Sequence, residues 1–117
     1  MLLPEGVQDV ECPEPVEGLF WVYILFCANG TLYTGQSYDV QKRLTRHADG
    51  KGARHTRQIK HFQLVYFEGP MSGEAAIQRE RQIKKWSKTK KLALIRGEKE
   101  TLKKLSRSRE KTSQRGI

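Results

Sequence analysis

The sequence predicts an α+β domain in which helices cover a small sheet. Two strand-like segments joined by turn residues open the ordered part of the chain, a third strand-like segment follows a helix, and two helix-like segments come last. The element order is therefore β-β-α-β-α-α. A sheet this small cannot bury itself, so helices must pack against it. A chain of 117 residues allows one such domain and little more.

Strand and cap signals give the first half of this order. Aromatic and β-branched residues make Phe20–Phe26 a strand, and the turn residues Ala28–Gly30 lead back into a short strand at Thr31–Thr34. Asp39 is a good N-cap for a helix that Gly50 ends. The apolar face of this helix consists of Val40, Leu44 and Ala48.

The second half of the order follows from the same kinds of signal. Phe62–Phe67 is expected to be a third strand, which Gly69-Pro70 stops. Helical spacing returns from Glu74 to about Trp86, and its apolar stripe consists of Ala76, Ile77 and Ile83. Ser87 is expected to cap a last helix, Lys88–Ile95, before Gly97.

The two ends of the chain differ from the middle. Residues 1–18 hold three of the four prolines, five acidic residues and no base, which predicts a disordered acidic leader outside the fold. The folded domain is expected at residues 19–96, and a basic tail at residues 97–117. The leader either shields a basic face of the same molecule or reflects a start codon placed too far upstream.

Charge indicates the class of partner. After residue 18 the chain carries 22 basic residues against 8 acidic ones, which is the electrostatic footprint of a nucleic-acid-binding protein. A basic protein with no such role is the alternative.

No apolar run approaches the ~20 residues of a membrane span, and the N-terminus lacks the pattern of a signal peptide. Cys12 and Cys27 are too few for a disulfide framework, so we expect a cytoplasmic protein.

Three groups of side chains are candidates for chemistry. At about 100° per residue, Glu80 falls inside the predicted apolar stripe, where a carboxylate needs a cation or a metal beside it. A boundary glutamate paired with arginine is the alternative. Arg43 and His47 share one helix face, where Arg43 could clamp a phosphate with its planar guanidinium; the alternative is an ordinary solvated face of a basic helix. Tyr23 and Tyr33 taken singly are typical of packing on a sheet face.

The joint pattern is more specific than any one member. Val22-Tyr23, then Tyr33-Thr34-Gly35, then Arg43 and His47, and then the segment Ala76–Trp86 with Glu80, resembles the GIY-YIG nuclease superfamily. The likeness covers residues 19–96 and is greatest to the small stand-alone bacterial members. Trp21 and Thr34 replace the leading glycine of the first motif and the isoleucine of the second.

The resemblance implies a fold and an activity. The fold is a three-stranded antiparallel sheet flanked by helices, and the activity is hydrolysis of nucleic-acid phosphodiester bonds that depends on Mg²⁺ or Mn²⁺. We expect an endonuclease that acts on DNA, directed by DNA structure in repair or recombination. The implied catalytic residues are Tyr23, Tyr33, Arg43, His47 and Glu80, with Glu80 as the metal ligand.

Tyr23 and Tyr33 can share a site only if the register of the hairpin puts both on the same face of the sheet. A two-residue Asn29-Gly30 turn would put Tyr23 and Tyr33 on opposite faces of the sheet. A three-residue loop instead pairs Leu25 with Tyr33, and both tyrosines then share a face. Gly30 suits the left-handed position of such a loop, so we expect the three-residue loop.

Basic residues around the site are expected to hold backbone phosphates. They are Lys51, Arg54, Arg57 and Lys60 in the loop after the first helix, and Lys84, Lys85, Lys88, Lys90 and Lys91 further along. The second group could equally be solvated helix surface.

Two other functions stay open, a non-catalytic DNA- or RNA-binding protein that keeps the fold and a small RNA-binding protein of the translation apparatus. The sequence leaves the oligomeric state undecided.

Overall fold

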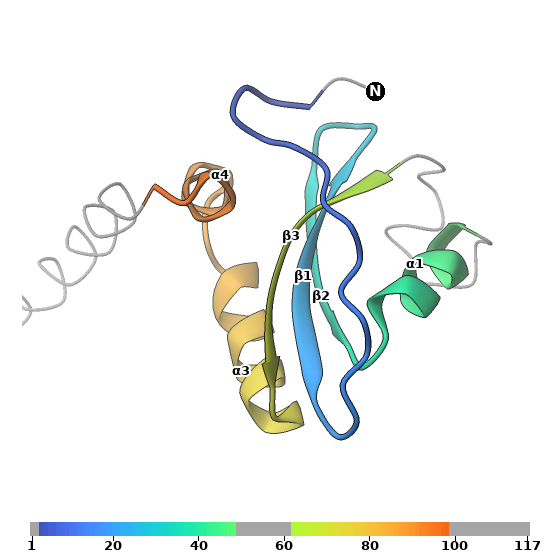
Figure 1. Cartoon of the computed structure of the whole chain (residues 1–117). Helices are drawn as coiled ribbons and strands as arrows, with labels where there is room; N and C mark the ends of the chain where they lie inside the picture. The colour runs from blue at the N-terminus through green and yellow to red at the C-terminus, as the bar shows by residue number, and fades with distance from the viewer. Residues whose placement is uncertain (1–2, 49–61, 99–117) are drawn as a thin grey trace, which may run out of the picture. The chain divides into compact units, whose positions relative to one another are not determined.

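The computed structural model describes residues 3–48 and 62–98. A three-stranded antiparallel sheet combines with helices in the predicted order (Figure 1). The elements are β1 (Phe20–Cys27), β2 (Leu32–Ser37), α1 (Val40–Ala48), β3 (Phe62–Met71), α3 (Gly73–Lys84) and α4 (Lys88–Arg96). The predicted α+β class and element order are therefore confirmed. Among the described residues, no helix has the length and apolar character needed to cross a membrane.

The hairpin between β1 and β2 has the predicted three-residue loop. The Cys27 N–H donates to the Thr31 carbonyl at 2.9 Å, and the Gly30 N–H donates back to the Cys27 carbonyl at 2.8 Å. Gly30 has a φ of 86°, which glycine adopts without strain. Leu25 lies opposite Tyr33, as the three-residue loop requires.

Two strands are longer than the sequence predicted. β2 continues to Ser37 because β1 still offers pairing partners, Val22 to Gln36 and Trp21 to Ser37. β3 continues through Pro70 to Met71, which pairs with Phe20 beyond an irregularity in the ladder. β3 is an edge strand in the order β2-β1-β3, and proline is tolerated at edges and irregularities. The predicted stop at Gly69-Pro70 is therefore wrong.

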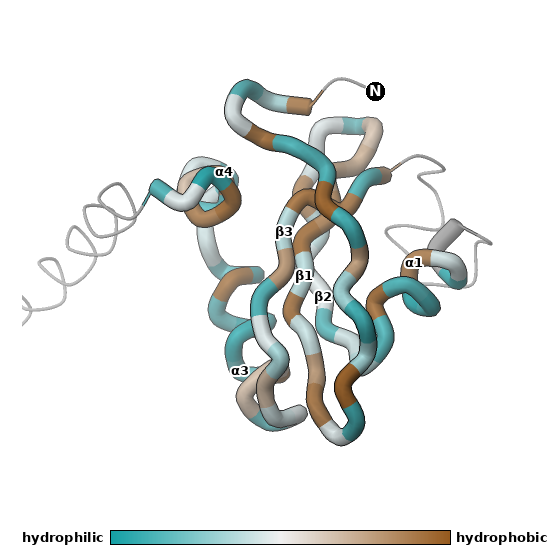
Figure 2. Tube along the Cα trace, viewed as in Figure 1, coloured by the Kyte–Doolittle hydropathy of each residue, from teal (hydrophilic) through white to brown (hydrophobic). Residues whose placement is uncertain are grey.

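The core is built on both faces of β1, the central strand. On one face Trp21, Tyr23 and Leu25 form a buried cluster with Val40 of α1 and Leu64 of β3. Residues alternate across the strand, so Val22 and Ile24 point to the other face, and α3 lies on that side of the sheet (Figure 1). Figure 2 shows apolar residues along these strands, alternating with more polar ones.

The first helix, α1, begins at the expected cap, Asp39, whereas α3 begins after Ser72 and its apolar stripe differs from the prediction. Asp39 Oδ1 accepts the Lys42 N–H at 3.1 Å at the start of α1. In α3 the buried residues are Ala76 and Ile83, whereas Ile77 is 41% exposed. Ile77 was wrongly placed in the stripe because apolar character alone was counted. The buried line instead runs between Arg79 and Glu80, which flank it.

The C-terminal helix belongs to a separate compact unit that begins at Trp86. Ser87 caps α4 as predicted, since its Oγ accepts the Lys90 N–H at 3.2 Å, and Gly97 ends the helix with a φ of 71°. The Lys90 ammonium lies 4.1 Å from the centre of the Trp86 ring, and Lys90 is buried. Lys90 therefore adds nothing to the exposed positive charge expected along this helix.

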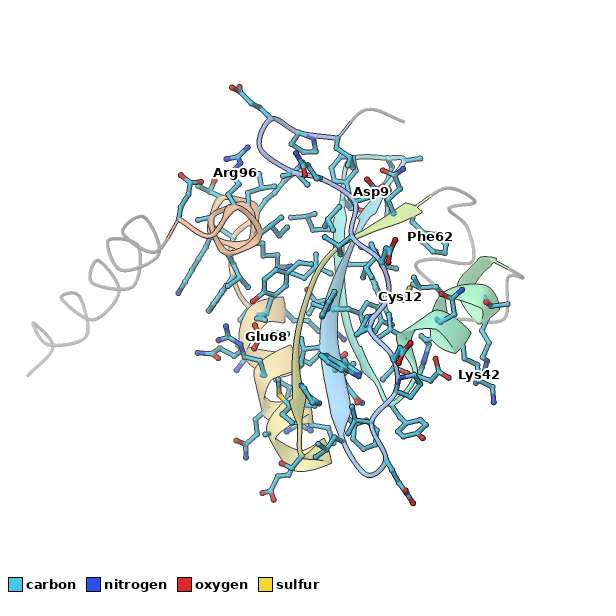
Figure 3. The ribbon with its side chains drawn as sticks, in the orientation of Figure 1. Asp9, Cys12, Lys42, Phe62, Glu68 and Arg96 are labelled. Carbon is cyan, nitrogen blue, oxygen red and sulfur yellow. The ribbon has the colours of Figure 1, made fainter. Side chains whose placement is uncertain are left out.

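The acidic leader contributes to the fold over the part that the structure describes. Val7 is only 6% exposed, and the Val10 N–H donates to the Leu64 carbonyl of β3 at 2.9 Å. Cys12 packs against the buried cluster, as does Phe62 at the start of β3 (Figure 3). Apolar residues turned inward hold the segment, while its acidic residues stay exposed. The expectation of a disordered leader outside the fold is corrected for residues 3–18.

Candidate active site

Two tyrosines from neighbouring strands form the centre of the candidate site. Tyr23 of β1 and Tyr33 of β2 share a sheet face because of the hairpin register, and their ring centroids lie 6.5 Å apart. Tyr23 is 1% exposed, whereas Tyr33 is half-buried. The sheet therefore holds one phenol rigidly and leaves the other closer to solvent.

Gly35 makes room for the Tyr23 ring. It lies opposite Tyr23 in the ladder, and a Cβ on Gly35 would stand 2.6 Å from the Tyr23 hydroxyl oxygen and 2.7 Å from Cζ. Any side chain at this position would displace the ring. Sequence reasoning quoted Gly35 as part of a motif but gave it no role. The available signal was a glycine inside a strand, which often marks a close approach of another group.

Arg43 reaches the site from α1. The helix starts directly after β2 because Asp39 caps it, and Arg43 is half-buried in its second turn. The positive charge of Arg43 lowers the pKa of both Tyr23 and Tyr33, which places the guanidinium within electrostatic reach of the two phenols. His47 lies one turn further along α1, but its side chain is outside the described residues.

Glu80 reaches the site from α3. Its side chain is 19% exposed, and its Oε2 pairs with the Lys84 ammonium at 3.3 Å. The negative charge of Glu80 raises the pKa of both tyrosines. Glu80 is thus a boundary glutamate paired with a basic residue, as in the alternative interpretation, with a lysine of the same helix in the place of an arginine. Lys84 also lowers the pKa of Tyr33, so it lies beside the site.

Burial determines the protonation state of the phenols. Removal from water raises the pKa of Tyr23 well above its ordinary value, the neighbouring Tyr33 and Glu80 raise it further, and Arg43 opposes them. The same main cause, burial, raises the pKa of Tyr33. Both hydroxyls are therefore protonated at neutral pH and are able to donate a hydrogen bond. A phenolate would need additional positive charge nearby.

The edge strand β2 explains how residues from two helices meet. α1 and α3 both contact β2, although the two helices lie on opposite sides of the sheet (Figure 1). Tyr33 stands on this strand, and the charges of Arg43 and Glu80 both act on it. The structure thus brings together four of the five predicted catalytic residues, namely Tyr23, Tyr33, Arg43 and Glu80.

The donor set suits a cation that needs few protein ligands. Among the described residues, no group of three or more His, Cys, Asp or Glu side chains could hold a metal ion. Mg²⁺ retains several waters and takes further oxygens from a substrate phosphate, so one carboxylate is enough to bind it at such a site. Glu80 is the carboxylate whose charge acts on both phenols.

The predicted nucleic-acid contacts are only partly described. Lys51, Arg54, Arg57 and Lys60 lie outside the described residues. Lys84 is exposed beside Glu80, and Lys88 is exposed at the start of α4, in the second unit. Within the first unit, the structure places Lys84 beside the site.

Comparisons with known proteins cover the same part of the chain. Residues 19–93 match the model of the GIY-YIG catalytic domain. A UPF0213 protein of Staphylococcus saprophyticus is 43% identical over 75 residues, which are 64% of this chain and 92% of that protein. A UPF0213 protein of Natronomonas pharaonis is 44% identical over 78 residues, or 67% of this chain and 92% of that protein. The solution NMR structure of a UPF0213 protein from Bacillus halodurans is 42% identical, covers 66% of this chain and 82% of that chain, and has a TM-score of 0.44.

Proposed function

Because the chain belongs to the GIY-YIG catalytic domain family, a family of nucleases, we propose that it is an endonuclease that hydrolyses DNA phosphodiester bonds with Mg²⁺ or Mn²⁺. The observation that carries the proposal is that the charges of Arg43 and Glu80 both act on the same two phenols, Tyr23 and Tyr33. A cation, an anion and two hydroxyl donors gathered around β1 and β2 match the needs of phosphoryl transfer.

Arg43 holds the scissile phosphate in this proposal. Its planar guanidinium donates two parallel hydrogen bonds to phosphate oxygens, which fixes the group and stabilises the charge that develops on it. The position of Arg43 supports this role, because α1 presents it half-buried at the rim of the sheet. A half-buried arginine side chain is less mobile than one on the open surface, so its guanidinium holds a bound phosphate in a more defined position.

Glu80 provides the carboxylate for the divalent cation, which when bound supplies charge neutralisation on the phosphate and polarises a water. Partial burial keeps this carboxylate close to the phenols, and it has to exchange its ion pair with Lys84 for the cation. Lys84 is 51% exposed, so its ammonium can turn to solvent or to a DNA phosphate once released.

Tyr23 and Tyr33 orient the attacking water. Both phenols are protonated at neutral pH because burial raises their pKa, so each hydroxyl donates a hydrogen bond and still has lone pairs to accept one. Tyr23 is fixed by Gly35 and by the core, which suits a positioning role. His47, one turn beyond Arg43 on α1, assists by accepting a proton from the water.

DNA is the substrate we propose, and its structure directs the cut. The chain has a formal net charge of +9, which favours a polyanion, and DNA that is deformed or branched can be selected without contacts to the bases. Cleavage in repair or recombination would use such structure-directed selection. We place the protein in the cytoplasm, consistent with Cys12 and Cys27 both being free thiols.

Incubation with supercoiled plasmid tests the proposed function. Wild-type protein with Mg²⁺ or Mn²⁺ is expected to nick or linearise the plasmid, and EDTA to stop the reaction. Glu80→Gln keeps the size of the side chain and removes its charge, so it should abolish cleavage and leave DNA binding in a gel-shift assay largely intact. Binding without cleavage by the wild-type protein would instead identify a non-catalytic nucleic-acid-binding protein, and cleavage by Glu80→Gln would remove Glu80 from the mechanism.

A further inference from the structure

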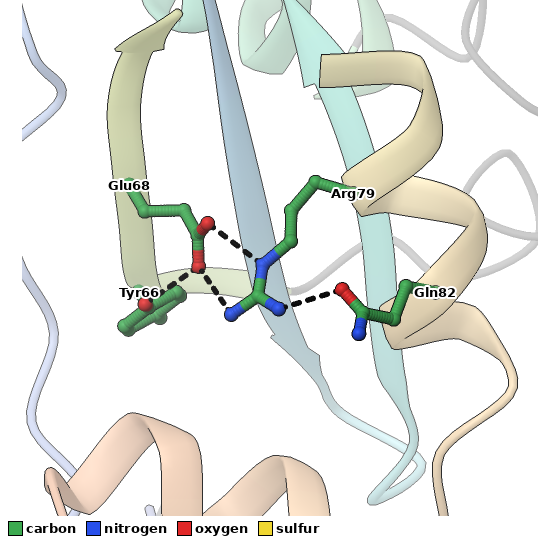
Figure 4. Close-up of polar contacts among 4 residues, drawn as sticks. All are labelled: Tyr66, Glu68, Arg79 and Gln82. Carbon is green, nitrogen blue, oxygen red and sulfur yellow. Dashed lines mark hydrogen bonds and ion pairs between the residues drawn. The ribbon is translucent and has the colours of Figure 1, made fainter. Parts of the chain in front are cut away.

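The flank of α3 opposite Glu80 carries a polar network to β3 (Figure 4). The Arg79 guanidinium donates from Nε to Glu68 Oε2 at 2.8 Å and from Nη2 to Glu68 Oε1 at 3.2 Å. Its remaining Nη1 donates to Gln82 Oε1 at 2.8 Å. The Tyr66 hydroxyl donates to Glu68 Oε1 at 2.8 Å. One carboxylate on β3 is thus held by an arginine from the helix and by a tyrosine from its own strand.

The network of Arg79, Glu68 and Tyr66 holds its side chains in one defined arrangement. The two parallel hydrogen bonds between Arg79 and Glu68 match the planar fork of the guanidinium, which gives the contact direction as well as strength. The side chains are only 27% and 22% exposed, so solvent screens the pair less than it would a surface pair. Burial and the Glu68 carboxylate raise the pKa of Tyr66, so its hydroxyl keeps the proton that it donates.

Arg79 and Glu80 are neighbours in sequence and lie on either side of the buried line of α3. Successive residues of a helix are about 100° apart, and the line between these two consists of the buried residues Ala76 and Ile83. Because Ala76 is small, the packing of this line sets the distance between α3 and the sheet. It constrains the rotation of the helix about its own axis less well. A rotation would move Glu80 away from Tyr23 and Tyr33.

We propose that Glu68 and Arg79 are positioning residues, whose ion pair sets the rotation of α3 and thereby holds the Glu80 carboxylate beside the two phenols. The inference rests on the proposed function for its catalytic consequence. Neither residue touches the substrate or the cation, and both act through Glu80. Partners of this kind, one shell away from a metal ligand, typically change metal affinity or activity by about 10- to 100-fold when they are replaced.

Two single variants and a matched control test this inference. Arg79→Met and Glu68→Gln break the pair, whereas Arg81→Met removes the same charge from an exposed position of the same helix. We expect the Mn²⁺ dissociation constant, measured by electron paramagnetic resonance on the purified protein, to rise about 10-fold or more in the first two variants and to stay unchanged in the third. In cleavage assays kcat should fall by a similar factor while KM for DNA is unchanged.

Two further measurements separate positioning from general destabilisation. The double variant Glu68→Gln/Arg79→Met should lose no more Mn²⁺ affinity than either single variant, because all three lack the same pair. Arg79→Lys, which keeps the charge but not the fork, should recover part of the loss. All measurements are made well below the melting temperature of each variant, where circular dichroism shows the folded state.

The outcomes distinguish this inference from the proposed function. Unchanged Mn²⁺ affinity and kcat in Arg79→Met, together with an inactive Glu80→Gln, would overturn the positioning role and leave the nuclease intact. Losses that multiply in the double variant would also overturn it, because the two residues would then act separately. A wild-type protein that binds Mn²⁺ but cleaves no nucleic acid would refute the nuclease, while the affinity comparison would still decide the role of the pair.

Discussion

The Tyr23 phenol lies against Gly35, its partner across the ladder, so closely that a Cβ on Gly35 would stand 2.6 Å from the hydroxyl oxygen. Tyr23 is 1% exposed and belongs to the buried core cluster. The position of the buried phenol therefore depends on the absence of a side chain at residue 35. This relationship gives a physical reason for the glycine that ends the second motif.

Gly35→Ala is expected to displace the Tyr23 ring. Overpacking of a well-filled core costs about 1–3 kcal/mol of unfolding free energy, and the displaced hydroxyl should lower kcat more than it changes KM for DNA. Thermal unfolding and plasmid cleavage measure the two effects. Gly73→Ala is the control, because the methyl group there comes no nearer than 3.2 Å to its nearest neighbour, the Phe20 ring, which needs to shift only by a few tenths of an ångström. Full activity of Gly35→Ala would show that the ring position does not matter for catalysis.

Tyrosine titration reports the electrostatic contacts of the site directly. Glu80 raises the pKa of Tyr23 and Tyr33 and Arg43 lowers it. Glu80→Gln should therefore lower both pKa values, and Arg43→Met should raise them. NMR of ¹³Cζ-labelled tyrosine measures each residue separately. Tyr66 is an internal control, since its neighbours Glu68 and Arg79 are unchanged in both variants.

The same pKa shift predicts the sign of an alkaline effect on stability. Burial raises the pKa of Tyr23 in the folded state, so the unfolded chain releases this proton first, near pH 10. The contribution of Tyr23 to the unfolding free energy is fully present below about pH 10 and is lost as the pH rises above it. Urea unfolding of Tyr23→Phe should show a smaller decrease across this range than the wild type. An equal decrease would mean that Tyr23 ionises alike in both states.

Arg43→Met should reduce the rate of cleavage far more than the affinity for DNA. Loss of one preorganised donor to a developing charge typically costs about 100- to 1,000-fold in kcat, whereas the rest of the basic surface is unchanged. Single-turnover cleavage and gel-shift titration measure the two quantities. Arg46→Met, an exposed arginine of the same helix, controls for the loss of one charge. A variant that loses affinity alone would make Arg43 a docking residue.

Val7 and Val10 provide a matched test of the leader. Val7 is 6% exposed and Val10 is 40% exposed, although both belong to the same segment. Val7→Ala should lower the unfolding free energy by about 1 kcal/mol, and Val10→Ala should leave it unchanged. Differential scanning calorimetry gives both values. Equal melting temperatures for the two variants would mean that the leader is detached from the sheet in solution.

Local chemistry made much of the sheet predictable. The hairpin register followed from the conformational freedom of Gly30 and from period-two alternation, and it placed Tyr23 and Tyr33 on one face. Ser87 and Asp39 were recognised as caps because their side chains satisfy nearby backbone N–H groups. Such signals depend on neighbours in sequence, which is why they could be read without the fold.

Features that depend on distant partners were missed. β2 and β3 exceed their predicted lengths because β1 offers pairing partners that no local signal reveals. Ile77 is exposed because the small residue Ala76 faces the sheet, and the leader is held by Val7 and by a hydrogen bond to Leu64. The pairing of Arg79 with Glu68 joins residues that are 11 positions apart. At the site, helical spacing made Arg43 and Glu80 candidates and the family resemblance gave them roles, whereas the role of Gly35 follows only from its close approach to the Tyr23 ring.

A crystal structure of the wild-type protein with a short DNA duplex and Ca²⁺, as a substitute for Mg²⁺, tests the central claim most directly. The account predicts a cation about 2.3–2.6 Å from a Glu80 carboxylate oxygen, with a backbone phosphate bound to the Arg43 guanidinium and facing the hydroxyls of Tyr23 and Tyr33. A duplex bound to another surface, with no cation at Glu80, would contradict it.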